Sequence, residues 1–155
     1  MSIDSKELAD FLAKANKATY ANLEAKKSPS LRPQSRDYHF EDGGLTYHDT
    51  YFGARDFIGE EVVYKDAERV WGMNYYGFVL SAEVATEDAY KVLRSALRAE
   101  YDDILPVRGP SYFAEGDSEY RNAVEGTLER FIGMEEIFIG GRLVARCHYH
   151  GGQIV

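Results

Sequence analysis

Cysteine is almost absent from this chain, since Cys147 is the only one among its 155 residues. One cysteine cannot form a disulfide within the chain, and it cannot build a cysteine-rich zinc site or a redox-active dithiol. We expect Cys147 to be a small buried side chain in a strand. The low cysteine content indicates a protein of a reducing compartment.

Long hydrophobic runs are absent as well, and basic residues are in the minority. No stretch approaches the roughly 20 apolar residues of a membrane-spanning helix, and residues 1–8 lack the apolar segment of a signal peptide. The 18 Lys and Arg against 26 Asp and Glu leave a net charge of −8. This sign disfavours binding to nucleic-acid phosphates or to an anionic membrane. We therefore expect a cytoplasmic protein with no direct nucleic-acid or membrane contact.

Aromatic residues, in contrast, are abundant. The chain has 12 Tyr, 8 Phe and 1 Trp, while its hydrophobic share of 45% and charged share of 28% are ordinary for a globular protein. Its length suits one domain with one hydrophobic core. Amphipathic rings in this number are typical of half-buried sheets or of a concave surface that receives a ligand.

The spacing of apolar residues predicts two helices and six strands. A helix of about fifteen residues follows the capping-box spacing of Asp4 and Glu7, and a second helix begins at Thr86 with acidic residues in its first turn. Residues 25–44 contain prolines and glycines without periodicity, which predicts a long surface connection. The strands are expected over residues 45–52, 57–65, 69–80, 119–126, 131–139 and 142–150.

An internal repeat relates the two groups of predicted strands. A shift of 74 places residues 57–77 over residues 131–151 without a gap. The identical pairs are Phe57/Phe131, Ile58/Ile132, Gly59/Gly133, Glu61/Glu135, Val70/Val144, Tyr75/Tyr149 and Gly77/Gly151. A shift of 73 also pairs Tyr47 with Tyr120 and Asp49 with Asn122.

We therefore predict one domain, residues 1–155, with an internal duplication over about 45–80 and 119–151. The expected fold class is α+β. Two repeated three-stranded antiparallel meanders would form a curved six-stranded sheet or half-barrel. One helix would precede the repeats and one would lie between them.

Two glutamates occupy equivalent places in the repeat and are the candidate catalytic residues. Glu61 and Glu135 fall on an apolar strand side, where an unpaired carboxylate is costly and its pKa is raised, as general acid or base chemistry requires. The structural alternative is that tyrosine hydroxyls or backbone groups satisfy both carboxylates.

A second set of candidates lies on the opposite strand side. The first copy carries Asn74 and Tyr76 there, and the second carries His148 and His150. Two histidines so spaced can share a metal ion with a third ligand, but the first copy does not repeat them, so we predict no metal site. The glycine pairs lack the spacing of a phosphate-binding loop, and we expect no cofactor.

A resemblance to a known family rests on four runs of residues. They are Tyr47-His-Asp-Thr-Tyr-Phe-Gly, Phe57-Ile-Gly-Glu-Glu, Trp71-Gly-Met-Asn-Tyr-Tyr-Gly, and Glu135-Glu136-Ile with Tyr149-His-Gly-Gly. From about Leu8 onward the chain resembles a small bacterial domain-of-unknown-function family, found alone or C-terminal to XRE-type helix-turn-helix regulators. The resemblance implies an effector-sensing or protein-interaction role. One predicted N-terminal helix leaves no room for a helix-turn-helix unit, so DNA binding is not carried over.

Our leading hypothesis is a small-molecule binding or regulatory sensing module with a Tyr/Asn/His-lined sheet face. One alternative is a small hydrolase or isomerase with Glu61 or Glu135 as general base. A second alternative is a protein-interaction module that pairs with a partner, or with itself as a homodimer. The predicted ligand-binding residues are Tyr47, Asp49, Glu61, Asn74, Tyr76, Glu135, His148 and His150.

Overall fold

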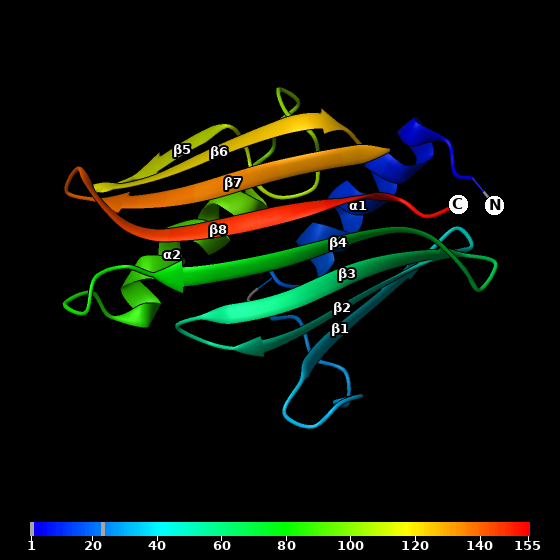
Figure 1. Ribbon diagram of the computed structural model, residues 1–155, viewed down its shortest axis with the longest axis horizontal. Helices are drawn as coiled ribbons and strands as arrows, with labels where there is room; N and C mark the ends of the chain where they lie inside the picture. The colour runs from blue at the N-terminus through cyan, green and yellow to red at the C-terminus, as the bar shows by residue number, and fades with distance from the viewer. Residues whose placement is uncertain (1, 23) are drawn as a thin grey trace.

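Eight antiparallel strands form a single sheet with two helices on one face, as the computed structural model of residues 2–22 and 24–155 shows (Figure 1). The helices are α1 (Ser5–Ala18) and α2 (Thr86–Arg98). The strands are β1 (Arg36–Asp42), β2 (Leu45–Gly53), β3 (Phe57–Lys65), β4 (Glu68–Val79), β5 (Tyr112–Glu115), β6 (Ser118–Thr127), β7 (Arg130–Ile139) and β8 (Arg142–Gln153).

The strand order is β1-β2-β3-β4-β8-β7-β6-β5. Each set of four strands follows the chain through hairpins, and we call β1–β4 the first half and β5–β8 the second half. The last strands of the two halves, β4 and β8, pair along the middle of the sheet. Both helices lie behind the sheet in Figure 1, so the sheet has one helix-covered face and one outer face.

The prediction of six strands in two three-stranded meanders is wrong, because each half has a fourth strand at its outer edge. The six predicted strands are present as β2–β4 and β6–β8. Strand β1 lies inside the predicted surface connection. Pro29 and Pro33 precede it, and they favoured a loop over a strand in this part of the sequence. Gly43 and Gly44, with φ of 58° and 83°, form its hairpin turn to β2. Strand β5 has only four residues, too few for a period to emerge.

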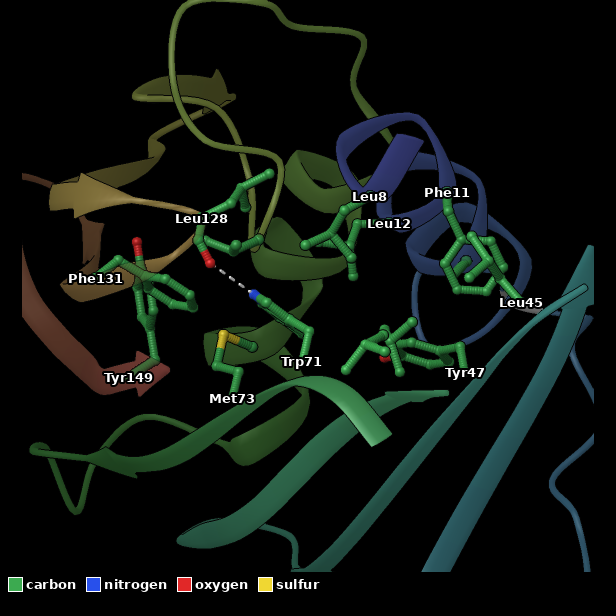
Figure 2. Close-up of a cluster of buried hydrophobic side chains, with 14 of the residues drawn as sticks. Leu8, Phe11, Leu12, Leu45, Tyr47, Trp71, Met73, Leu128, Phe131 and Tyr149 are labelled. Carbon is green, nitrogen blue, oxygen red and sulfur yellow. Dashed lines mark hydrogen bonds between the residues drawn. The ribbon is translucent and has the colours of Figure 1, made fainter. Parts of the chain in front are cut away.

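Helix α1 forms as its sequence predicts and covers the first half. The Asp4 carboxylate accepts hydrogen bonds from the backbone N–H groups of Lys6 and Glu7 at 3.0 and 3.1 Å, which caps the helix. Its apolar stripe packs into the core beside residues of β2 and β4 (Figure 2). The buried residues of the stripe are Leu8, Phe11, Leu12 and Ala15.

Helix α2 covers the second half. It contacts β5, β6 and β7, and its buried stripe packs against residues of β6, β7 and β8. Its N-cap is Ala85, which offers no side-chain hydrogen bond, but Glu87 and Asp88 place negative charge near the first turn. Neither described helix is both long and apolar enough to cross a membrane.

The pairing of the strands is symmetric about one point between β4 and β8. Tyr75 lies opposite Tyr149 there, and these are the residues that the shift of 74 makes equivalent. The pairing of β3 with β4 slips between Val63 and Tyr64, and that of β7 with β8 slips between Ile137 and Phe138, at equivalent places. The two halves therefore share strand register, while their origin by duplication stays a prediction.

A buried tryptophan joins the two halves in the core. Trp71 of β4 donates a hydrogen bond from Nε1 to the carbonyl oxygen of Leu128 at 3.1 Å (Figure 2). Its ring stacks on Phe131 of β7 with 5.8 Å between ring centroids. The two ends of the chain also meet, because the Gln153 side chain donates to the Ile3 carbonyl oxygen at 3.1 Å.

Candidate functional site

A cavity of about 430 Å³ lies between the helix-covered face of the first half, one side of α2 and the segment after α1. Cavities of this size are typical of small-molecule sites. Its aromatic lining residues are Tyr20, Tyr38, Tyr47, Tyr51, Phe57, Tyr75 and Tyr90. Its charged lining residues are Lys27, Arg36, Asp49, Glu61, Glu87, Arg94 and Arg108.

Two buried carboxylates form the polar part of the cavity floor. Asp49 of β2 lies opposite Glu61 of β3 in the strand register, and both side chains are buried. The Tyr75 hydroxyl donates to Asp49 Oδ1 at 2.6 Å. Among the described residues, none forms a hydrogen bond with Glu61 Oε2, although this oxygen is buried. A buried acceptor without a partner is costly, so this oxygen is a point at which a ligand donor would be stabilised.

In the second half, both oxygens of the corresponding carboxylate accept hydrogen bonds. Glu135 of β7 accepts hydrogen bonds from Arg108 Nε at 2.5 Å and from the Tyr120 hydroxyl at 2.6 Å. Beside them, the Tyr149 hydroxyl donates to Asn122 Oδ1 at 2.5 Å. Arg108 and Glu135 form a buried ion pair, which fits the structural alternative for Glu135.

The environment of the first-half carboxylates raises their pKa values. Burial raises the pKa of Asp49 to about 7, against the opposing effects of the Tyr75 hydroxyl and the Arg108 guanidinium. Burial and the nearby Asp49 charge raise the pKa of Glu61 to about 8. The pair therefore exchanges protons near neutral pH, as ligand-responsive and catalytic carboxylates do.

Arg108 is the charged side chain that links the two halves at this point. Its guanidinium lies over the Tyr75 ring at 5.5 Å from the centroid while it bonds Glu135. Burial lowers the pKa of Arg108, but the Glu135 carboxylate and other nearby acids outweigh this, and the pKa stays well above its ordinary value. Arg108 is thus a permanent cation between Glu135 and the cavity.

A second, shallower depression lies on the outer face, and we call it the outer groove. It has a volume of about 520 Å³. Asn74 lies opposite His150, and Tyr76 lies opposite His148, across the central β4–β8 pair. The groove is lined by Arg32, Phe52, Ile58, Gly59, Glu60, Asn74, Tyr75, Tyr76, His148 and His150.

The structure divides the eight predicted site residues between the two faces of the sheet. Tyr47, Asp49 and Glu61 line the cavity, and Glu135 lies beside it, bound to Arg108. The other four residues come together in the outer groove; they are Asn74, Tyr76, His148 and His150. Alternate residues of a strand point to opposite faces, so one ligand cannot touch both sets.

Sequence reasoning missed Arg108 and most of the tyrosines around the cavity. Arg108 lies between Pro106 and Pro110 in a segment without periodicity, so the sequence carries no sign of its burial. Tyr38 lies on the missed strand β1. The sequence did indicate a polar role for Asn122, because the shift of 73 pairs it with Asp49.

Metal binding and thiol chemistry find little support among the described residues of the cavity and the outer groove. Within residues 2–22 and 24–155, no group of three or more His, Cys, Asp or Glu side chains is arranged to hold a metal ion. Cys147 is buried in β8, as predicted from the sequence. Burial raises the pKa of its thiol to about 12, so it is a poor nucleophile at neutral pH.

Comparison with known proteins identifies a family without an assigned activity. No curated protein matches the chain, and no solved structure matches it. A family model described as a domain of unknown function, DUF5680, matches residues 49–154. This range includes both cavity carboxylates, Arg108 and Glu135. Because the match covers more than half of the sequence, the chain belongs to the DUF5680 domain family.

Proposed function

We propose that this protein binds a small molecule in the cavity between its helices and the first half of the sheet. The observation that carries this proposal is Glu61, a buried carboxylate that lines the cavity and has one oxygen without a hydrogen-bond partner among the described residues. The surrounding tyrosines offer apolar ring faces together with hydroxyl groups. A ligand with a polar group at Glu61 and an apolar body among the rings matches this lining.

The cavity is a better candidate than the outer groove for this function. Its carboxylates are shielded from water, which strengthens hydrogen bonds and charge interactions with a ligand. The outer groove is open, and Tyr76 on its surface is 46% exposed. The resemblance to domains attached to XRE-type regulators supports a regulatory sensing role, in which ligand binding changes how the protein acts on a partner.

A thermal-shift screen of a broad metabolite library tests the proposal. Ala54→Trp places a large ring at an exposed position of the cavity lining, and Ala114→Trp makes the same change at an exposed position of β5 away from it. We expect ligands of the wild type to be lost by Ala54→Trp and kept by Ala114→Trp. Ligands lost instead by Tyr76→Ala or His148→Ala would transfer the site to the outer groove and refute the cavity.

A second candidate function is acid or base catalysis in the same cavity, favoured by the raised pKa values of Asp49 and Glu61. At neutral pH such a pair holds both a proton donor and a proton acceptor. The ion pair of Glu135 with Arg108 favours Glu61 over Glu135 as the base of this reaction. If a library ligand is turned over, Glu61→Gln should abolish turnover while binding remains; undiminished turnover would dismiss this function.

A further inference from the structure

The two halves of the sheet carry corresponding polar residues, but among the described residues only Glu135, and not Glu61, is paired with a cationic side chain. In the second half, Arg108 donates to Glu135. In the first half, no Lys or Arg among the described residues forms an ion pair with Asp49 or Glu61. The corresponding residues are Tyr47 and Tyr120, Asp49 and Asn122, Glu61 and Glu135, and Tyr75 and Tyr149.

Counting back along the chain from the paired edge strands places Ser35 of the first half where the second half has Arg108. Tyr112 pairs with Arg121 in the second half as His39 pairs with His48 in the first. Arg108 comes four residues before Tyr112, and Ser35 comes four residues before His39. Ser35 carries no charge, and its hydroxyl donates to Asp37 at 2.6 Å on the face of the sheet opposite to Glu61. The first half therefore has no built-in counterpart of the guanidinium.

The charges around the cavity are arranged by depth. The buried cluster holds the carboxyl groups of Asp49, Glu61 and Glu135 against the single guanidinium of Arg108. The other basic groups of the lining are Lys27 and Arg36, which are exposed, and Arg94, which pairs with Glu87. The floor thus has an excess of acid, while basic side chains lie toward the mouth.

We propose that the cavity binds an organic cation with N–H donors, a guanidinium or amidinium head, which contacts Glu61 and Asp49 as Arg108 contacts Glu135. This inference rests on the proposed binding function and names its ligand class. An N–H donor would supply the missing partner of Glu61 Oε2, and a planar head would match a carboxylate. The Tyr38 and Tyr51 rings, stacked with 6.4 Å between centroids, lie in the same lining, and the Arg36 guanidinium over the Tyr51 ring at 5.9 Å shows that a planar cation packs on these rings.

Binding of a cation would also change the protonation of the floor. A positive head favours the ionised forms of Asp49 and Glu61, so protons are released on binding and affinity rises with pH through about 6 to 8. The groups that face these carboxyls are Tyr47, Tyr75, Arg108 and Glu135, and the Asp37 charge acts on Asp49 from the opposite face of the sheet. Tyrosine and arginine keep their protons across this range, and the pKa of Asp37 lies below its ordinary value, whereas the pKa values of Asp49 and Glu61 are raised into it.

A matched pair of probes tests the charge of the head. In 4-guanidinobutanoate a guanidinium is joined to a carboxylate tail, which suits the basic mouth, and 4-ureidobutanoate replaces only the guanidinium by a neutral urea. By calorimetry at about pH 8, we expect the guanidinium probe to bind at least about tenfold more tightly than the urea probe. Repeating the titration in buffers of different ionisation enthalpy measures the protons released on binding. Glu61→Gln should remove this preference, while the outward-facing Glu60→Gln should keep it.

The outcomes separate this inference from the proposed function. Equal binding of the two probes, or tighter binding of the urea, would overturn the cationic head and leave a ligand-binding cavity. A second outcome has the same meaning. If neither probe binds, but neutral or anionic library compounds bind and Ala54→Trp blocks them, the proposal of a cationic head fails and the binding function stands. If Ala54→Trp blocks no ligand at all, the proposed function fails together with the inference.

Discussion

Glu61 and Glu135 are the same residue type at equivalent places in the sheet, and their neighbours give them different roles. Glu135 accepts from a guanidinium and a tyrosine hydroxyl, which offset the cost of burying its charge. Glu61 has one oxygen without a partner among the described residues, and burial raises its pKa to about 8. A single side chain, Arg108, thus pairs with one glutamate, and the other is the one that we propose as the ligand contact.

The raised pKa of Glu61 predicts how stability depends on pH. The folded protein keeps a proton on this carboxyl that the unfolded chain releases above the ordinary pKa of 4.5. The free energy of unfolding therefore falls as pH rises from about 5 to 8, by up to about 1.4 kcal/mol per pH unit for one such group. Glu61→Gln stays neutral and should stabilise the protein increasingly over this range, measured by urea unfolding at a series of pH values.

Glu60→Gln is the control for this series. Glu60 precedes Glu61 but points to the outer face, where its carboxylate is exposed and lies 3.9 Å from Arg32. Its removal should shift stability by less than about 1 kcal/mol and leave the pH dependence unchanged. Parallel curves for the wild type and Glu61→Gln would show that the Glu61 carboxyl is not the group that titrates.

Prediction from the sequence succeeded at residues whose role depends on local pattern. Strand alternation assigned Tyr75 to the core and Tyr76 to the opposite side, and Tyr75 is buried whereas Tyr76 is exposed. It could not foresee Arg108, because the partner of a buried charge depends on where an irregular segment crosses the sheet. For the same reason it could not tell which glutamate was paired.

At the level of elements, prediction worked where the period was long enough to detect. Helices α1 and α2 and six strands have a clear apolar stripe or alternation. Edge strand β5 was not predicted because it has only four residues, and β1 was not predicted because a polar residue on it is buried. Asp37 on β1 is fully buried among hydrogen-bond donors, so the strand does not show the apolar alternation of its neighbours.

Strand β1 is held in place by the Asp37 carboxylate. It accepts hydrogen bonds from the hydroxyls of Ser35 and Thr50, both at 2.6 Å, and lies 3.0 Å from His48 Nε2. Burial raises the pKa of Asp37, but these hydrogen bonds outweigh it and hold the pKa below its ordinary value. The ionised carboxylate therefore connects β1, β2 and the segment before β1.

We predict that Asp37→Asn lowers the free energy of unfolding by about 2–4 kcal/mol, because an amide cannot accept from all of these donors and leaves one or more unpaired. Equilibrium unfolding in urea measures the change. Asp42→Asn on the same strand removes only the exposed pair with Lys14 and should cost less than about 1 kcal/mol. Equal effects of the two substitutions would contradict an anchoring role for Asp37.

At the scale of the whole molecule, the core depends on contacts between the two halves. The Tyr75 and Tyr149 side chains meet beside the central strand pair, and glycines opposite them leave room for their rings. A Cβ on Gly59 would overlap Tyr75, and one on Gly133 would overlap Tyr149. Phe131, Leu128 and Tyr149 share one core cluster with residues of α1 and β1–β4, so the first half does not enclose its own core.

The only tryptophan of the chain reports on this dependence. Trp71 is fully buried, and its hydrogen-bond acceptor, Leu128, belongs to the second half. In a fragment of residues 1–81, β4 becomes an unpaired edge, and Trp71 loses both Leu128 and the Phe131 ring. We expect that fragment to emit like a solvent-exposed tryptophan and to unfold without a cooperative transition.

Adding a fragment of residues 82–155 should restore the blue-shifted emission of the intact protein as β4 pairs with β8, since the two halves complete one core. Trp71 emission followed during titration of one fragment into the other measures this association. A matched mixture with Phe131→Ala in the second fragment should associate more weakly, because it lacks the ring that stacks on Trp71. Blue-shifted emission and cooperative unfolding of residues 1–81 alone would instead mean that each half folds independently, contrary to the shared core.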